Sequence, residues 1–154
     1  SPLKNIQNSK RIIKFVETIR TLLHNQKVTN IFEINKKKIF TLEDAEALLP
    51  LVYKLTEEYS RQVKKLINQL EAFPNKQSER AIQVESLINA LIEQWQSKIE
   101  RLGAKPKGLW LADFDNGSGY FCWKFPETKI KFFHGYNEGF SGRKSLEETS
   151  FELQ

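Results

Sequence analysis

Hydrophobic residues recur every three or four positions along most of the first hundred residues, a spacing typical of amphipathic helices. One such segment covers about residues 9–25, and two longer ones cover residues 42–72 and 78–102. Pro74 and Asn75 separate the two long segments, and Gly103 followed by Pro106 ends the second. Because the link between them is short, we expect the two long helices to form an antiparallel hairpin.

The first long segment begins with a helix-capping pattern. Thr41 is a favourable N-cap residue, and Asp44 follows three positions later, close to the arrangement of a capping box. Glu43 and Asp44 also place negative charge at the positive end of the helix dipole. Pro50 falls inside the pattern and predicts a kink near the second turn.

After Gly103 the hydrophobic period changes to two, which indicates strands. We expect strands at residues 109–114, 120–125 and 129–136, with turns at Asn116-Gly117 and at Pro126. Residues 137–143 are expected to form a loop. The predicted fold is therefore α+β: a long antiparallel helical hairpin plus an N-terminal helix, packed on a three-stranded antiparallel β-meander.

The alternation also predicts two faces for this sheet. One would carry mainly aromatic residues and cover the helices: Trp110, Ala112, Phe114, Phe121, Trp123, Phe125, Ile130, Phe132, His134 and Tyr136. The opposite face would then carry Leu111, Asp113, Cys122, Lys124 and Phe133. This sorting depends on the strand register, because a slip of one residue exchanges the two faces.

With 154 residues, the chain is expected to form one domain. Its parts would be an N-terminal helical extension (1–37), the helical hairpin (38–103), the meander and loop (104–146) and a tail (147–154). No apolar run approaches the ~20 residues of a membrane span, and no secretory signal is visible. We therefore expect a cytoplasmic protein without membrane association. The long apolar stripes predict a homodimer through the helices.

The net charge of +5 is concentrated at one end of the chain. Residues 1–40 hold nine Lys or Arg against two Glu, whereas residues 103–154 hold seven of each sign. A basic segment can bind phosphates, so nucleic-acid binding through the N-terminal third is one alternative function. Charges at this density more often solvate a helix face, which ranks this alternative low.

Residue types that carry chemistry gather between residues 108 and 143. This stretch holds the only Cys, one of the two His and six of the seven Gly. We single out Asp113, Cys122, Glu127, His134 and Arg143. Arg143 offers a planar fork for a carboxylate or phosphate, and the Gly-rich loop before it could add backbone N–H groups. This favours a non-enzymatic binding module that takes a small anionic ligand or an acidic group of a protein partner. An ion pair between Glu127 and Arg143 is the structural alternative.

A second alternative is a small hydrolase or thiol-dependent enzyme, in which Cys122 is the nucleophile and His134 its base. Phe121 and Trp123 flank Cys122, and a cysteine between aromatic residues is usually a small buried hydrophobe. One Cys and one His lack the paired spacing of a typical zinc motif, so the sequence predicts neither a metal site nor a cofactor.

Four motifs together resemble a prokaryotic family known as domain of unknown function 2203. They are F-T-L-E-D-A-E-A-L-L-P at 40–50, G-L-W-L-A-D-F at 108–114, G-Y-F-C-W-K-F-P-E at 119–127 and F-H-G-Y-N-E-G-F-S-G-R at 133–143. The resemblance covers about residues 38–146. Pro126 and Phe133 stand where the family often has Gly and Trp, but the Cys, Glu, His and Arg are in place. The resemblance implies no established activity.

Overall fold

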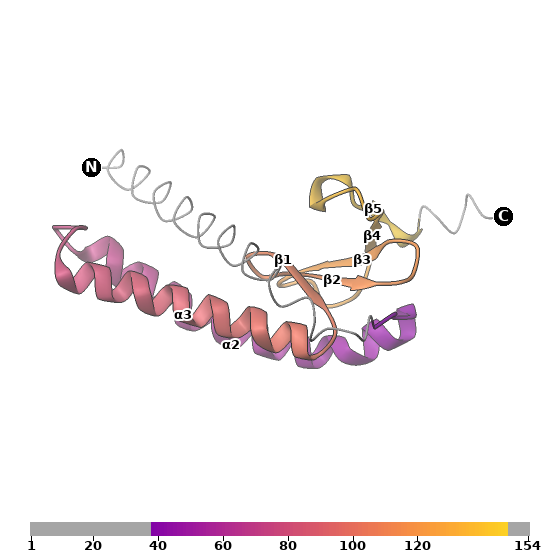
Figure 1. Cartoon of the computed structure of the whole chain (residues 1–154), viewed down its shortest axis with the longest axis horizontal. Coiled ribbons are helices and arrows are strands. Elements are labelled where there is room, and N and C mark those ends of the chain that lie inside the picture. Colours follow the sequence, from indigo (N-terminus) through magenta and orange to yellow (C-terminus); the bar gives the residue numbers. More distant parts are fainter. Residues whose placement is uncertain (1–37, 148–154) are drawn as a thin grey trace, which may run out of the picture. The chain divides into compact units, whose positions relative to one another are not determined.

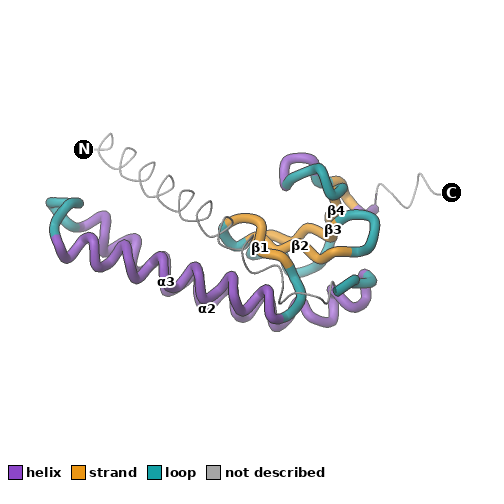
Figure 2. The backbone as a smooth tube through the Cα atoms, viewed as in Figure 1, coloured by secondary structure: helices purple, strands orange, loops and turns teal. Residues whose placement is uncertain are grey.

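The computed structural model describes residues 38–147. Two helices, α2 (Leu42–Ala72) and α3 (Glu79–Arg101), precede a set of short strands (Figures 1 and 2). The described residues divide into two compact units, one formed by residues 59–95 and the other by residues 38–58 with 96–147. The predicted N-terminal helix at residues 9–25 and most of the predicted tail lie outside the described residues.

Helix α2 has the bounds that the sequence predicts, and its capping box is present. The backbone N–H of Thr41 donates to Oδ2 of Asp44 at 3.2 Å, and the backbone N–H of Asp44 donates to Oγ1 of Thr41 at 3.1 Å. Hydrogen bonds from the backbone and then from the side chain of Thr41 to the Asp44 carboxyl group lower the pKa of that group. Helix α3 is one residue shorter at each end than predicted.

The unit formed by residues 59–95 is an antiparallel pair of helix segments. Its buried side chains come from both helices, whereas Ile82 and Leu87, which we expected on the buried side of α3, are exposed. The buried residues are Tyr59, Val63, Leu70, Ala81, Val84, Ile88, Ile92 and Trp95. In the connecting turn, Nζ of Lys76 donates to the carbonyl oxygen of Leu70 at 2.6 Å. A cation at this place interacts favourably with the carbonyl groups at the C-terminal end of α2.

The other unit contains an antiparallel sheet of five strands, not the predicted three. The strands are β1 (Lys105–Gly108), β2 (Leu111–Asp115), β3 (Tyr120–Lys124), β4 (Phe132–His134) and β5 (Lys144–Ser145), paired in chain order. The sequence missed β1 and β5 because β1 contains a proline and β5 has only two residues. Strand β2 begins two residues later than predicted, since Trp110 has φ 59°, outside the range of a strand.

Strand register corrects the predicted faces. Asp113 pairs with Cys122, Cys122 with Phe132, and Tyr120 with His134. Paired residues share a face, so Phe132 and His134 lie with Asp113 and Cys122 rather than on the aromatic face where we expected them. Phe133, which we expected on the opposite face, pairs with Phe121 and lies on the aromatic face. The predicted sorting of β2 and β3 is confirmed; only β4 is shifted by one residue, and such a shift exchanges every side chain.

The aromatic face of β2 and β3 packs on the helix segments of the same unit. Ala112, Phe114 and Trp123 are fully buried. The ring of Phe40, just before α2, meets the ring of Phe114 edge-on at 5.2 Å, and Tyr53 of α2 lies 6.4 Å from Trp123. This packing leaves the opposite face, which we call the site face, to carry the polar residues of β2, β3 and β4. Neither described helix is long and apolar enough to cross a membrane.

Candidate metal centre

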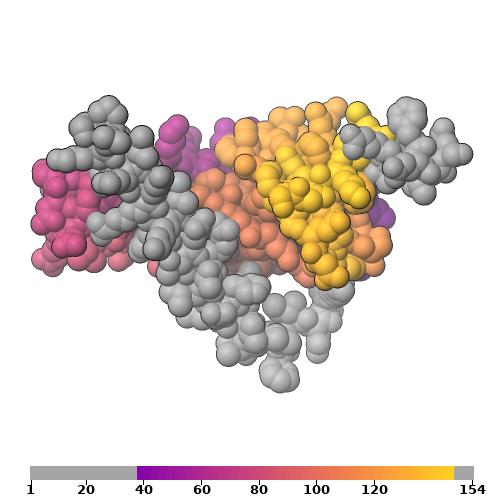
Figure 3. All heavy atoms as spheres, turned by 90° about the horizontal axis from the view of Figure 1, so that it is seen from above, coloured from indigo at the N-terminus to yellow at the C-terminus, as the bar shows by residue number. Residues whose placement is uncertain are grey.

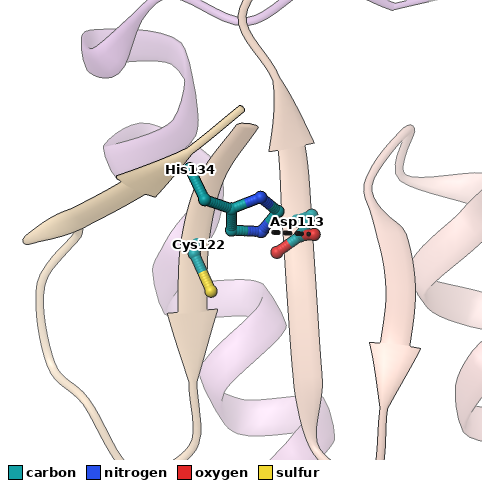
Figure 4. Close-up of side chains that lie close together, drawn as sticks. All are labelled: Asp113, Cys122 and His134. Carbon is teal, nitrogen blue, oxygen red and sulfur yellow. Dashed lines mark hydrogen bonds and ion pairs between the residues drawn. The ribbon is translucent and has the colours of Figure 1, made fainter. Parts of the chain in front are cut away.

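Three neighbouring strands bring Asp113, Cys122 and His134 together on the site face. Asp113 is the central residue of β2, Cys122 is the central residue of β3, and His134 is the last residue of β4. One ligating atom from each lies within 4.8 Å of the other two. The side chains point toward one another from separate strands (Figure 4). All three are buried, with exposed fractions of 1%, 0% and 2%.

The His134 ring is held from both sides. Its Nε2 lies 3.0 Å from Oδ2 of Asp113, and its Nδ1 lies 2.9 Å from the backbone carbonyl oxygen of Gly135. A carbonyl oxygen can only accept, so Nδ1 carries the proton in this contact. In the neutral ring, Nε2 then carries no proton, and its lone pair faces a carboxyl oxygen of Asp113. The two atoms can approach to this distance only if a proton or another cation lies between them.

Asp113 contributes a second unusual feature. Its Oδ1 is buried and has no hydrogen-bond partner among the described residues. Burial raises the pKa of this carboxyl group, while the charge of His134 acts in the opposite direction. A buried, unsatisfied carboxyl oxygen is costly in a protein interior and is rare unless an ion or water completes it.

Cys122 is a fully buried thiol. Burial is the main reason that its pKa rises to about 12, and the charge of Asp113 and a hydrogen bond to Asp113 add to the effect. The nearby Arg143 partly opposes the rise. A thiol with this pKa is protonated at neutral pH and is a weak nucleophile. His134 also directs Nε2 at Asp113, so the three residues do not form the Cys–His–Asp order of a thiol-dependent catalytic triad.

The remaining predicted residues, Glu127 and Arg143, form the ion pair that the sequence left as an alternative. Nη1 of Arg143 lies 3.0 Å from Oε1 and 2.9 Å from Oε2 of Glu127. The guanidinium group also stacks on Phe132, with its central carbon 3.9 Å from the ring centroid. Arg143 is therefore held by a carboxylate and an aromatic ring rather than open to a free anion.

Sequence reasoning missed a second carboxyl group on the site face. Asp115 follows Asp113 by two residues on β2, so both side chains share a face. Its Oδ1 accepts hydrogen bonds from the Tyr136 hydroxyl at 2.6 Å and from the backbone N–H of Gly117 at 2.9 Å. This hydrogen bond, which the Tyr136 hydroxyl donates to Asp115, is the main reason that the pKa of Tyr136 rises to about 12. The spacing of two residues between Asp113 and Asp115 in a predicted strand could have indicated that both carboxyl groups lie on one face.

Comparison with known proteins gives one match. The model of a family described as an uncharacterized conserved protein (DUF2203) matches residues 38–146, which include both helices, all five strands and the three clustered side chains. No curated protein and no solved structure matches the chain. Since the matched segment covers well over half of the sequence, the chain belongs to the DUF2203 family of uncharacterized conserved proteins.

Proposed function

We propose that this protein is a metal-binding module whose sheet holds one divalent transition-metal ion, with Zn²⁺ as the best fit. One observation carries the proposal: ligand-type atoms of Asp113, Cys122 and His134 converge within 4.8 Å in a buried place. Each comes from a different strand, so the ion would tie β2, β3 and β4 together. This is a binding function, as the sequence suggested, but for a cation.

The chemistry of the three side chains favours zinc over harder ions. Thiolate, imidazole and carboxylate are the usual zinc ligands, whereas Mg²⁺ and Ca²⁺ take oxygen ligands. Zinc binds N and O at about 2.0–2.2 Å and S at about 2.3 Å, so neighbouring ligand atoms around a tetrahedral ion lie roughly 3–4 Å apart. The 3.0 Å between His134 Nε2 and Asp113 Oδ2 is close to this range. The sulfur of Cys122 lies within 4.8 Å of a ligand atom of each of the other two residues.

Electrostatics also favours a cation over the anion that we first expected. An anion at this place would lie beside the Asp113 carboxyl group and in the buried space where ionised groups cost most. A divalent cation would compensate the carboxylate and a thiolate together. It would also give the unsatisfied Oδ1 of Asp113 a positive neighbour.

The surroundings of His134 support the same assignment. A histidine that binds metal through one nitrogen almost always donates from the other to a carbonyl or carboxylate, which fixes the ring and its tautomer. His134 has this arrangement before any ion is considered, because Nδ1 contacts the Gly135 carbonyl and Nε2 faces the cluster. The ring is thus oriented for binding through Nε2.

A competition titration with a chromogenic zinc chelator tests the proposal. We expect the wild-type chain to bind one Zn²⁺ per molecule. Cys122→Ser and Asp113→Asn should each weaken the affinity at least 100-fold, because each removes one of three ligands; even loss of an outer-shell partner typically costs about 10–100-fold.

Glu46→Gln is the matched control, since Glu46 is an exposed carboxylate outside the cluster and its loss should leave the affinity unchanged. Circular dichroism establishes that each variant is folded. The proposal is wrong if the wild type binds zinc no more tightly than folded Cys122→Ser.

A further inference from the structure

We propose that the ion pair between Arg143 and Glu127 is a latch that sets how fast the metal enters and leaves the buried site. This inference rests on the proposed metal-binding function and concerns its regulation. It starts from burial: because all three ligand side chains are at most 2% exposed, an ion can reach them only when some covering segment moves.

The covering segment beside Cys122 is the end of the C-terminal loop. Cys122 and Phe132 are cross-strand partners on the site face, and Arg143 stacks on the Phe132 ring. Arg143 is also close enough to the thiol of Cys122 for its charge to act on it. In Figure 3, which looks down on the molecule of Figure 1, the described C-terminal segment (yellow) lies in front of the sheet (orange).

Glu127 is a fixed anchor for this segment. Besides binding Arg143, its Oε1 accepts a hydrogen bond from the backbone N–H of Lys124, at the end of β3, at 2.7 Å. Its own carbonyl oxygen accepts from Nε1 of Trp123 at 2.6 Å, and Trp123 is fully buried. The carboxylate is therefore tied to the end of β3, while Arg143 belongs to the loop.

The loop itself is a small piece with hydrogen bonds of its own. Its first turn is closed by the backbone N–H of Gly135, which donates to Oε2 of Glu138 at 2.9 Å. A single 3₁₀ turn, η2 (Phe140–Gly142), ends directly before Arg143. The Tyr136–Asp115 hydrogen bond secures the loop near its start. Near its end, the loop is secured by the Arg143–Glu127 pair and by β5, which follows Arg143 directly and pairs with β4.

The Arg143–Glu127 ion pair is weak enough to break and re-form repeatedly. The side chains of Arg143 and Glu127 are 18% and 23% exposed, so water can compete for the pair. Partly exposed ion pairs hold two groups together only modestly. The pair joins two residues that are not ligands of the proposed ion, so it should be closed in both the free and the loaded protein. Weakening it should then speed entry and exit alike.

Two variants keep the positive charge beside Cys122 while weakening the pair. Glu127→Gln replaces the anchoring charge with a neutral amide. Arg143→Lys keeps a cation but loses the guanidinium group, whose Nη1 contacts both oxygens of Glu127 and whose plane stacks on Phe132. The full chain is loaded with one Zn²⁺ and mixed with an excess of chromogenic chelator in a stopped-flow instrument. Zinc uptake by the metal-free chain is followed in the same way.

We expect both variants to release and take up zinc about tenfold faster than the wild type, with an affinity within about threefold of it. Glu46→Gln should release zinc at the wild-type rate. Unchanged release by both folded variants overturns the latch, and so does faster release with unchanged uptake, which would show that the pair only stabilises the bound ion. A wild type that binds no zinc overturns the proposed function and the latch with it.

Discussion

Of the three clustered residues, Asp113 has the polar atoms that its surroundings satisfy least well. One of its oxygens faces a lone pair of His134, the other has no hydrogen bond among the described residues, and the side chain is 1% exposed. The first contact needs a proton or another cation between the two atoms, and the second leaves a buried oxygen unsatisfied; one metal ion would meet both needs. The unsatisfied carboxyl group of Asp113 is the physical reason to propose a metal ion at this site.

Gly119 allows His134 to reach the cluster. A Cβ atom at Gly119 would lie 2.5 Å from the backbone oxygen of His134, closer than real Cβ contacts come. Gly119→Ala should therefore push β4 away from β3, destabilise the fold by about 1–3 kcal/mol and weaken zinc binding. Urea unfolding and the zinc titration measure the two effects.

Gly139→Ala serves as the matched control, because nothing lies within 4 Å of a Cβ added there. It should change neither the stability nor the affinity by a measurable amount. If Gly119→Ala behaves like Gly139→Ala, the close approach of β3 and β4 does not position His134.

The residues of the site could be identified from sequence, but their arrangement could not. Asp113, Cys122 and His134 stood out because their types are scarce in this chain. Their convergence depends on the register of β4, and His134 follows a run, Phe132 and Phe133, in which both neighbouring positions are aromatic. Period-two alternation cannot decide which of two adjacent aromatic residues faces the helices, so the predicted face of β4 was wrong.

At the scale of elements, α2 was predicted to the residue because its signals are local. Thr41 and Asp44 bond each other across one turn, and no distant contact is needed to place the start of the helix. Strands β1 and β5, by contrast, have no local signals that would predict them. Their pairing partners, β2 and β4, supply the hydrogen bonds that make them strands, and nothing in Lys105–Gly108 alone indicates this.

The capping box gives a pH-dependent prediction for this element. The pKa of Asp44 is lowered in the folded protein, mainly by the hydrogen bond from the Thr41 backbone. The folded state therefore binds this proton less readily than the unfolded state. The resulting stability is present above the ordinary pKa of 3.8 and is lost as the pH falls through the lowered value.

Asp44→Asn removes this contribution, because the amide does not titrate. The variant should be less stable than the wild type at pH 7, and the difference in the free energy of unfolding should shrink as the pH falls below about 4. Urea unfolding at a series of pH values measures the difference. A gap that stays constant down to pH 2.5 would show that the charge of Asp44 does not stabilise the helix.

For the whole molecule, the class of fold follows from the change in hydrophobic period near Gly103, from about 3.6 to 2. Membership of the DUF2203 family rests on residues 38–146 and therefore on the same helices and sheet. The homodimer and nucleic-acid binding through the basic N-terminal third stay predictions. They depend on surfaces and charges that no local motif specifies.

Cobalt substitution tests most directly whether the three side chains bind one metal ion together. Co²⁺ takes the place of zinc in such sites, and its spectrum reports both the ligands and their geometry. We expect the wild-type chain, titrated with one equivalent of Co²⁺, to develop a thiolate-to-cobalt charge-transfer band and the intense visible bands of tetrahedral coordination. Cys122→Ser should lose the charge-transfer band. A wild-type spectrum identical to that of Co²⁺ in buffer would contradict the assignment of a metal centre to Asp113, Cys122 and His134.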